Sequence, residues 1–442
     1  MTDMVSPATL TWGEGRRGIH TTAQADARLR KRYAAELRFK LFGLAAVSVA
    51  ILALVVLLGS ILHGGITAFV STQIRLDVEF DPAVIDAKGG REALLQADWA
   101  KIVDAALEAK FPEATSRPAR RALSGLVSPG AQQELRNMVI ADPALIGQKR
   151  TVWLIASSDV DMFMKGYYER PKAGAPEGGR VNERSIAWID RLVSEGAIER
   201  RFNTRFFTAA DSREPELVGI WGGIVGSLFT LLITLALAFP IGVAGAIYLE
   251  EFAPKNRFTD LIEVNINNLA AVPSIVFGLL GLAVFINAFG MPRSAPLVGG
   301  CVLALMSLPI IIIAGRAALK AVPPSIREAA LGVGASKMQM VLHHVLPLAM
   351  PGMLTGTILA MAHALGETAP LLMIGMVAFV VDVPTSPLQA ATVLPVQIFM
   401  WADHPERGFI EKTSAAILVL LVFLLAMNAI AIYLRKKFER KW

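Results

Sequence analysis

The sequence predicts an all-α polytopic membrane protein with an inserted α+β domain outside the membrane. Two observations predict the membrane part. Hydrophobic residues make up 54% of the 442 residues, above the usual share in soluble domains, and they gather in long runs. A third observation predicts the insertion, because residues 64–217 contain no such run and mix charges of both signs. That length is sufficient for a domain with its own core.

Six apolar runs are long enough to cross the hydrocarbon core of a bilayer, which takes about 20 residues. They lie near 41–63, 218–249, 262–289, 295–319, 352–380 and 415–434. The first run lies far from the N-terminus and exceeds the roughly 7–15 apolar residues of a signal peptide, so we expect it to remain as an anchor. We therefore expect a basic N-terminal segment, an anchor, an inserted domain, a five-helix core and a basic tail, at 1–40, 41–63, 64–217, 218–434 and 435–442.

Basic residues flank the outermost runs. Six of them, from Arg28 to Lys40, precede the first run, and five, from Arg435 to Lys441, follow the last. Lysine and arginine collect on the cytoplasmic side of membrane proteins. We therefore expect both termini in the cytoplasm, as an even number of spans requires, and the inserted domain on the extracytoplasmic side.

The inserted domain shows both strand and helix patterns. Apolar residues alternate over Thr72–Phe80, which predicts a strand. They recur at helical spacing over 91–110 and, more weakly, over 183–199. A loop rich in glycine and proline, 170–180, connects these parts. An α+β lobe follows from these patterns.

Composition excludes or disfavours several classes of function. The single cysteine, Cys301, lies inside the fourth run, so neither a disulfide framework nor a thiolate metal site is available. Asp159 and Asp161 lack further ligands at metal-binding spacing, and we expect them on a solvated surface. The net charge of +6 is small and much of it flanks the runs, which disfavours nucleic acid as a partner. No P-loop motif occurs, so we expect ATP and Mg to be bound only by another polypeptide. We expect no metal, cofactor or catalytic residue in this chain.

Between the fourth and fifth runs, residues 322–350 form a polar stretch rich in small residues. Ser325 precedes Glu328 by three positions, and Ser336 precedes Gln339 by three, which is the spacing of a capping box. Each pair predicts a helix start. We therefore expect a hairpin of two short helices that stands outside the membrane on the cytoplasmic side.

The same stretch carries signals for the helix ends. Gly332 and Gly334 separate the two predicted helices, and we expect Pro347 to end the second. Ala329 and Ala330 give the first helix a flat face on which another protein can dock. The hairpin therefore indicates mechanical coupling to a partner subunit.

Glu367 is predicted about halfway through the fifth run, where a charge costs about 2.5–3.5 kcal/mol and is a functional candidate by default. His363 lies four residues earlier, on the same helical face. Pro370 has no N–H for the carbonyl of Gly366, so we expect a kink at Glu367. A kinked span with a carboxylate is typical of a lined pathway. The alternative is a structural ion pair with a neighbouring helix.

Polar residues also occur in the third and fourth runs. Asn268 lies five residues before Pro273, and Ser274 directly follows it. These polar residues line a pathway or form hydrogen bonds between helices, and the two interpretations are equally supported. Arg316 and Lys320 end the fourth run. The sorting of positive charge to the cytoplasmic side explains them adequately, and a role of Arg316 on the translocation path is the less favoured alternative.

The sequence Glu328-Ala329-Ala330, followed by Gly334 and by Leu346-Pro347, resembles the Glu-Ala-Ala loop of ABC importer permeases. In that superfamily the loop docks into a groove of the ATP-hydrolysing subunit. His344 departs from the pattern, because an aliphatic residue is usual there. The resemblance implies a core like that of the type I ABC importer permeases. It also implies that ATPase coupling uses Ser325, Glu328, Ala329, Ala330, Gly332, Gly334, Ser336 and Pro347.

Two further stretches, 267–279 and 366–372, resemble the A-type permease subunit of the bacterial phosphate-specific ABC transporter. This resemblance covers about 218–442, and residues 1–217 resemble the long-form N-terminal region of some members. It implies a bacterial inner-membrane location, a second permease of the C type, two ATPase subunits and a periplasmic phosphate-binding protein.

Glu367 matches the intramembrane glutamate of that family, and His363 stands where some members carry an arginine. We therefore expect a translocation path along His363, Gly366, Glu367, Thr368, Pro370, Asn268, Ser274 and Arg316. The resemblance implies a permease subunit, not an enzyme, that moves inorganic phosphate by alternating access. The alternatives are a permease for another oxyanion, such as molybdate or phosphonate, and a membrane sensor or scaffold.

Overall fold

The computed structural model describes residues 23–85, 90–170, 181–377 and 379–438. Residues 1–60 and 61–442 form two compact units, and each is described by itself. The N-terminal residues 1–22, the predicted loop at 171–180 and the last basic residues, Arg440 and Lys441, lie outside the described residues.

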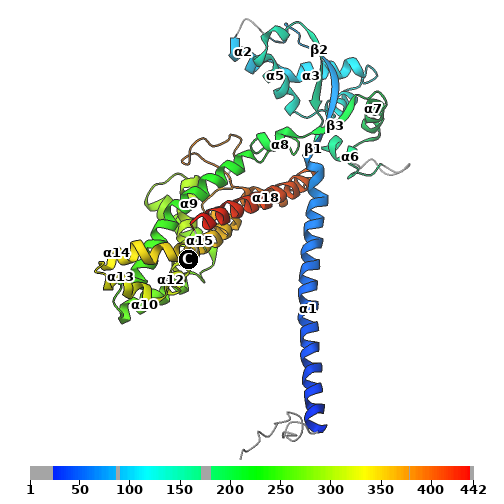
Figure 1. Ribbon diagram of the computed structural model, residues 1–442. Helices are drawn as coiled ribbons and strands as arrows, with labels where there is room; N and C mark the ends of the chain where they lie inside the picture. Colours follow the sequence, from blue (N-terminus) through cyan, green and yellow to red (C-terminus); the bar gives the residue numbers. More distant parts are fainter. Residues whose placement is uncertain (1–22, 86–89, 171–180, 378, 439–442) are drawn as a thin grey trace, which may run out of the picture. The chain divides into compact units, whose positions relative to one another are not determined.

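The first unit contains most of helix α1, Ala23–Gly65 (Figure 1). The predicted anchor, 41–63, lies within this helix, which is long and apolar enough to cross a membrane. Apolar side chains such as Leu44, Val55 and Leu57 are exposed. A helix that is apolar all round is stable in lipid.

The lobe of the second unit is built on a three-stranded antiparallel sheet in the order β2-β1-β3. Strand β1 is Val70–Glu79, β2 is Lys149–Ile155 and β3 is Ile198–Phe202. The predicted alternation is confirmed, since Ile74, Leu76 and Val78 are buried between exposed neighbours in β1. These side chains form the core of the lobe together with residues of the surrounding helices.

Among the described residues, the lobe and the segment after it contain seven short helices: α2 Gly90–Gln96, α3 Trp99–Lys110, α4 Arg117–Ser124, α5 Gly130–Ala141, α6 Ser158–Met164, α7 Glu183–Ser194 and α8 Thr204–Thr208. The helix predicted over 91–110 is therefore two helices. Asp98 caps α3 by accepting a hydrogen bond from the Lys101 backbone N–H, which starts a new helix there. The helix predicted over 183–199 ends early, because Gly196 has a φ of +60° and the chain continues into β3.

Asp161 is buried, so the expectation of a solvated surface is wrong for this residue. Its carboxylate accepts hydrogen bonds from the backbone N–H and hydroxyl of Thr72, at 2.8 and 2.7 Å. It also pairs with Lys165 at 2.7 Å, and Lys165 pairs with Glu411 at 2.9 Å. The ion pairs therefore connect the lobe to the last helix of the core, and the sequence spacing carries no sign of that contact.

The core of the second unit contains further helices: α9 Trp221–Ile247, α10 Arg257–Leu269, α11 Ser274–Gly281, α12 Pro296–Lys320, α13 Pro324–Gly332, α14 Lys337–Met340, α15 Leu346–Gly366, α16 Ala369–Met373, α17 Leu394–Ala402 and α18 Arg407–Phe438. Helix α12 packs between α9 and α15. Gly300 lies against Ile233 of α9, and Gly356 of α15 lies against Ala314. Small residues at these points let the backbones approach closely, as is typical of membrane helices.

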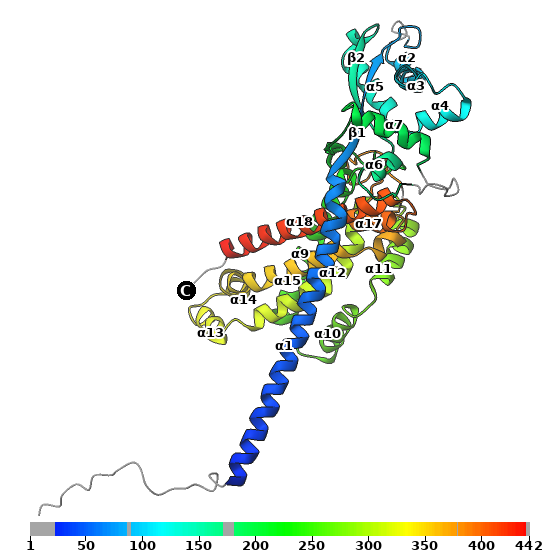
Figure 2. The ribbon, with the colours of Figure 1, turned by 90° about the vertical axis from the view of Figure 1, so that its right-hand side faces the viewer.

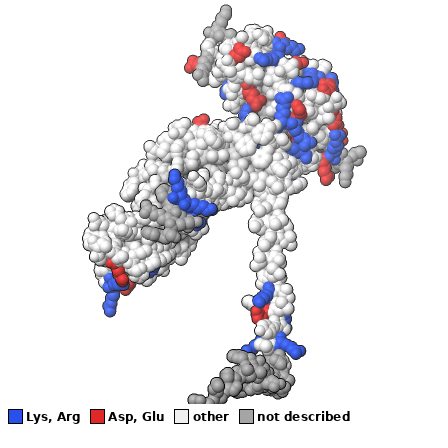
Figure 3. All heavy atoms as spheres, viewed as in Figure 1, with Lys and Arg blue, Asp and Glu red and all other residues white. Residues whose placement is uncertain are grey.

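The second unit differs from the prediction in the third and fifth spans. The third is broken, because α10 and the segment Ser274–Ala288 meet at an angle of 101° (Figure 2). The fifth runs over Lys337–Gly366 and not 352–380. Within the described residues, five helices are long and apolar enough to cross a membrane, or six if the bent pair is one span. In Figure 3, few charged side chains appear on the visible surface of the core, and many appear on the lobe.

Candidate functional site

The first helix of the hairpin, α13, begins at Pro324 and not at a Ser325 cap. No side-chain cap is present, so the predicted box of Ser325 and Glu328 is wrong. Proline at the first helical position has φ already set and loses no hydrogen bond, because that N–H has no partner inside a helix. Pro324 therefore starts α13, and Ser325 and Glu328 lie exposed on its first turns.

The turn between the two hairpin helices is set by Gly334, whose φ is +90°. The N–H of Gly334 donates to the Leu331 carbonyl, and the N–H of Ala335 donates to the Ala330 carbonyl. This is the Schellman pattern, in which glycine takes the left-handed position after a helix. Gly334 therefore ends α13, and Gly332 is still its last helical residue.

The second predicted capping box is confirmed. The Gln339 backbone N–H donates to the Ser336 hydroxyl at 3.3 Å, and the Ser336 backbone N–H donates to the Gln339 side-chain oxygen at 2.9 Å. Pro347, however, does not end this helix. The chain stays helical through a π-helical turn, Val341–Val345, and Pro347 is the second residue of α15, inside the continuous helical segment.

The exposed surface of the hairpin is more apolar than predicted. Ala329 is exposed, but Ala330 is buried against the core of the same chain, so the predicted face of two alanines is wrong. Leu331, Val333 and Met338 are exposed instead, and Val333 is 86% exposed. We define these three side chains as the hairpin patch. The signal for them was available, since each is apolar within a stretch that the sequence places outside lipid.

Arg327 fastens the hairpin to the membrane helices, a role that the sequence did not indicate. Its guanidinium pairs with Glu251, which follows α9, at 2.8 Å. It also donates to the carbonyls of Leu319 and Val322 at the end of α12, at 2.8 and 2.7 Å. Charge-assisted hydrogen bonds of this kind are about twice as strong as neutral ones. The hairpin is thus held at once to the ends of two helices.

Arg316 lies at the same end of α12 and pairs with two carboxylates. Its guanidinium is 3.3 Å from Glu250 and 2.5 Å from Glu263 of α10. Lys320 is 3.7 Å from Glu250. The structure thus places Arg316 among ion pairs that connect α12 with α9 and α10, and its role on the translocation path stays a prediction.

Glu367 lies where α15 ends, not halfway through a span. Its backbone is extended, with φ −78° and ψ 116°, and Pro370 lies at the start of the short helix α16. The helix breaks at this point instead of kinking. Pro370 has no N–H to donate to the Gly366 carbonyl, and Gly366 itself has a low helix propensity. The predicted proximity is confirmed, since His363 Nε2 lies 3.2 Å from Glu367 Oε1, but Glu367 lies just past the helix and not on its face.

The structure brings together the two stretches that carry the phosphate-permease resemblance. Helix α11 packs on α16, and a Cβ added to Gly278 would meet the Pro370 Cα at 2.7 Å. Ser274 starts α11 and is half-buried, and Thr368 is half-buried before α16. Asn268 lies beyond the bend, exposed near the end of α10. The predicted path residues on α11 and α15–α16 are therefore neighbours, whereas Asn268 belongs to another part of the core.

The family models match two parts of the chain. Residues 238–442 match the binding-protein-dependent transport system inner membrane component, and residues 26–173 match a domain of unknown function, DUF3333. The phosphate transport system permease protein PstA 1 of Mycobacterium tuberculosis H37Rv is 30% identical over 217 residues, which are 49% of this chain and 70% of that protein. PstA of Yersinia pestis is 32% identical over 222 residues, 50% of this chain and 74% of that protein.

The chain belongs to the PstA-type family of ABC transporter permeases. The probable permease YqgI of Bacillus subtilis is 32% identical over 188 residues, 42% of this chain and 63%, under two thirds, of that protein. A solved structure of the MetNI methionine ABC transporter aligns with 50% of this chain and 98% of its own, at 16% identity and a TM-score of 0.40.

As a PstA-type permease, the chain is a multi-pass inner-membrane subunit without catalytic activity of its own. Permeases of this kind work with a partner permease, a separate ATPase and a substrate-binding protein. The hairpin and the Glu367 region are therefore candidate sites for coupling and for translocation, and neither is an active site.

Proposed function

We propose that the chain is one of two permeases of an ATP-driven importer of inorganic phosphate. The observation that carries the proposal is the packing of α11 on α16, because it joins the two phosphate-permease-like stretches beside Glu367. The relatives at 30–32% identity support the substrate, since they are phosphate transport system permeases.

The hairpin and Glu367 lie at opposite ends of one helical segment, Lys337–Gly366. Thirty helical residues extend about 45 Å, at 1.5 Å per residue. A movement imposed on the hairpin is passed to Glu367 along this segment, and Arg327 passes it to α9 and α12 as well. Closure of the ATPase subunits is thereby converted into a rearrangement around Glu367.

The proposed partners are a second permease of the C type, two copies of an ATPase and a periplasmic phosphate-binding protein. The hairpin patch is the surface for the ATPase, because Leu331 and Val333 are exposed outside the membrane helices and Met338 is exposed on the first turn of the fifth span. The orientation follows from this assignment and from the basic flanks: hairpin and termini are cytoplasmic, and the lobe is extracytoplasmic.

Phosphate uptake by a strain that lacks this chain tests the function, with sulfate and molybdate uptake measured beside it. The proposal expects loss of phosphate uptake alone and its return with the intact gene. Loss of sulfate or molybdate uptake instead would establish another oxyanion as substrate. Unchanged phosphate uptake, with the other subunits expressed constitutively, would make the chain a sensor or scaffold.

Glu367→Gln tests the translocation site separately. The variant loses the charge that faces His363 at 3.2 Å but keeps the shape of the side chain. We expect the complex to assemble at normal levels and phosphate uptake to fall. Normal assembly with undiminished uptake would remove Glu367 from the path, without bearing on the substrate.

A further inference from the structure

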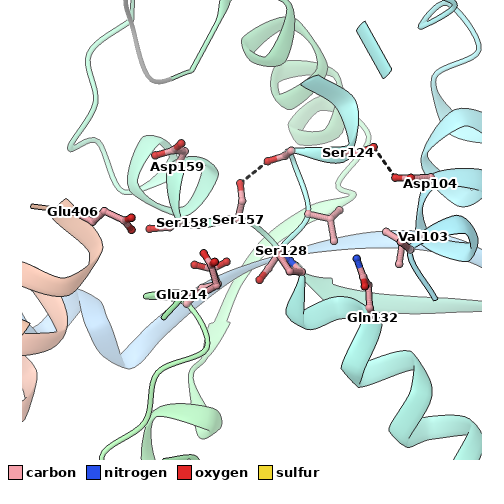
Figure 4. Close-up of a pocket in the computed structure, with 15 residues that line it drawn as sticks. Val103, Asp104, Ser124, Ser128, Gln132, Ser157, Ser158, Asp159, Glu214 and Glu406 are labelled. Carbon is pink, nitrogen blue, oxygen red and sulfur yellow. Dashed lines mark hydrogen bonds between the residues drawn. The ribbon is translucent and has the colours of Figure 1, made fainter. Parts of the chain in front are cut away.

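A pocket of about 470 Å³ lies where three parts of the second unit meet (Figure 4). The lobe contributes Asp104 of α3, Gln132 of α5 and the start of α6. The segment that leads to α9 contributes Glu214 and Glu216, and the turn before α18 contributes Glu406. A ligand held here would contact the lobe and the segments that precede α9 and α18 at once.

The pocket is strongly acidic. Five carboxylates line it, those of Asp104, Asp159, Glu214, Glu216 and Glu406, and its described lining includes no lysine or arginine. Four serines and Gln132 add neutral polar groups, and Figure 4 shows Asp159, Glu214 and Glu406 around the side where Ser158 lies. Clustered charge of one sign in a concave site attracts the opposite charge.

Of these carboxylates, Glu216 is the one that a bound cation would stabilise most. The residue is only 4% exposed, and its Oε2 has no hydrogen-bond partner among the described residues. Burial, together with the smaller effect of the charges of Glu214 and Asp161, raises the pKa of Glu216 to about 7 against the hydrogen bond from Ser128. A buried carboxylate oxygen without a partner is costly unless a proton or a cation satisfies it.

The neighbouring lysines are already engaged. Lys165 pairs with Asp161 at 2.7 Å and with Glu411 at 2.9 Å. The Lys412 ammonium donates to the Ala68 carbonyl at 3.1 Å. Neither lysine belongs to the pocket lining, although the buried Lys412 lies close enough to Glu216 for their charges to interact.

The size and spacing of the pocket indicate the class of cation. Within the described residues, no group of three or more acidic, histidine or cysteine side chains is placed to hold a metal ion. The volume also far exceeds one water-sized ion, whose share of space is about 30 Å³. Instead, several carboxylates in one pocket can bind a ligand that carries several separate ammonium or guanidinium groups.

We propose that this pocket binds a polyvalent organic cation that carries alkylammonium or guanidinium groups. Glu216 and Glu214 bind one such group, and Glu406 and Asp104 lie within the same hollow for others. The cation comes from a free polyamine or from the basic side chains of a partner protein. A cation bound in this pocket connects the lobe with the segments that precede α9 and α18.

Binding to the full chain in lipid nanodiscs tests the proposal, with spermidine as the free polyamine and a trilysine peptide as the basic side chains. We expect Glu216→Gln and Glu214→Gln each to weaken binding about tenfold or more, because each removes one charge-assisted contact. The matched control, Glu183→Gln at the exposed start of α7, should bind as the parent does. Binding of spermidine indicates a free polyamine, and binding of the peptide alone indicates a partner.

Gln132→Lys provides a second variant that does not remove an acid. It places an ammonium group in the pocket, so it should abolish binding of both probes and leave the protein folded. The proposal is overturned if neither probe binds the parent protein. It is equally overturned if the parent, Glu216→Gln, Gln132→Lys and Glu183→Gln all bind alike, because such binding is unspecific.

Discussion

Gly278 of α11 lies against Pro370 of α16, so closely that a Cβ at position 278 would stand 2.7 Å from the Pro370 Cα. The nearest atoms are the Cα and carbonyl oxygen of Pro370 and the Cβ of Met373, none of which can rotate away. This contact fixes the end of the Glu367 loop, because Pro370 follows Glu367 by three residues. Close packing at this point therefore positions the candidate path.

Gly278→Ala tests that contact. We expect it to lower phosphate uptake and to destabilise the chain by about 1–3 kcal/mol, the usual cost of overpacking. Uptake in cells and the thermal unfolding midpoint of the purified chain measure the two effects. The matched control is Gly59→Ala, whose added Cβ meets nothing within 4 Å. Equal behaviour of the two variants would show that α11 and α16 move apart freely.

Arg327 and Glu251 provide a test of coupling. Arg327→Gln removes the bond to Glu251 and the contacts with two α12 carbonyls, so hairpin movement should no longer reach α9 and α12. We expect uptake to fall about 5–150-fold, the range of a coupling energy of 1–3 kcal/mol, while the ATPase still hydrolyses ATP. The exposed Lys255→Gln is the control.

The pairing itself is measured by a double-mutant cycle. Glu251→Gln in the Arg327→Gln background should add little further loss, because the bond is already absent. Additive losses would mean that the two residues act independently, contrary to the geometry.

Val333, at 86% exposure, tests the hairpin patch. Val333→Asp should lower the amount of ATPase that co-purifies by at least about tenfold, because a charge buried in an interface without a partner costs about 2–5 kcal/mol. Val381→Asp is the matched control on another exposed segment. Unchanged co-purification of ATPase with Val333→Asp would move the docking surface away from the patch.

Glu216 predicts a pH dependence of stability. Its pKa is raised by burial from 4.5 to about 7, so the folded chain holds this proton more tightly than the unfolded chain. The stability from the proton is fully present below about pH 4.5 and is lost as the pH rises through about 7. The whole effect amounts to about 3 kcal/mol.

Glu216→Gln should therefore unfold at a higher temperature than the parent at pH 8, and the difference should disappear towards pH 5. Burial raises the pKa of Glu134 and Asp211 as well, so only the difference between variant and parent isolates Glu216. A constant difference across this pH range would contradict the assignment.

Sequence patterns predicted the features that depend on near neighbours. The alternation in β1, the box of Ser336 and Gln339 and the facing pair of His363 and Glu367 each need only a few residues. Contacts between distant segments were not predictable, and the bond of Arg327 to Glu251 spans 76 positions. At Pro324, two local signals competed, and the fixed φ of proline prevailed over the serine cap.

Lys165 is the point at which the lobe is joined to α18. Its ammonium is fully buried between the carboxylates of Asp161 and Glu411. Lys165→Gln leaves both acids without their cation, and breaking a buried pair in this way costs about 3–5 kcal/mol. The pair of half-buried Lys110 and exposed Glu195 at the lobe surface gives the control, since Lys110→Gln should cost less than about 1 kcal/mol.

Thermal unfolding of the purified full chain measures both lysine variants. Adding Glu411→Gln to Lys165→Gln should restore part of the lost stability, because one uncompensated charge is removed with its partner. If the uncompensated carboxylate causes the defect of Lys165→Gln, the double variant should also recover part of the phosphate uptake. A double variant less stable than Lys165→Gln would mean that Glu411 stabilises α18 through contacts other than this pair.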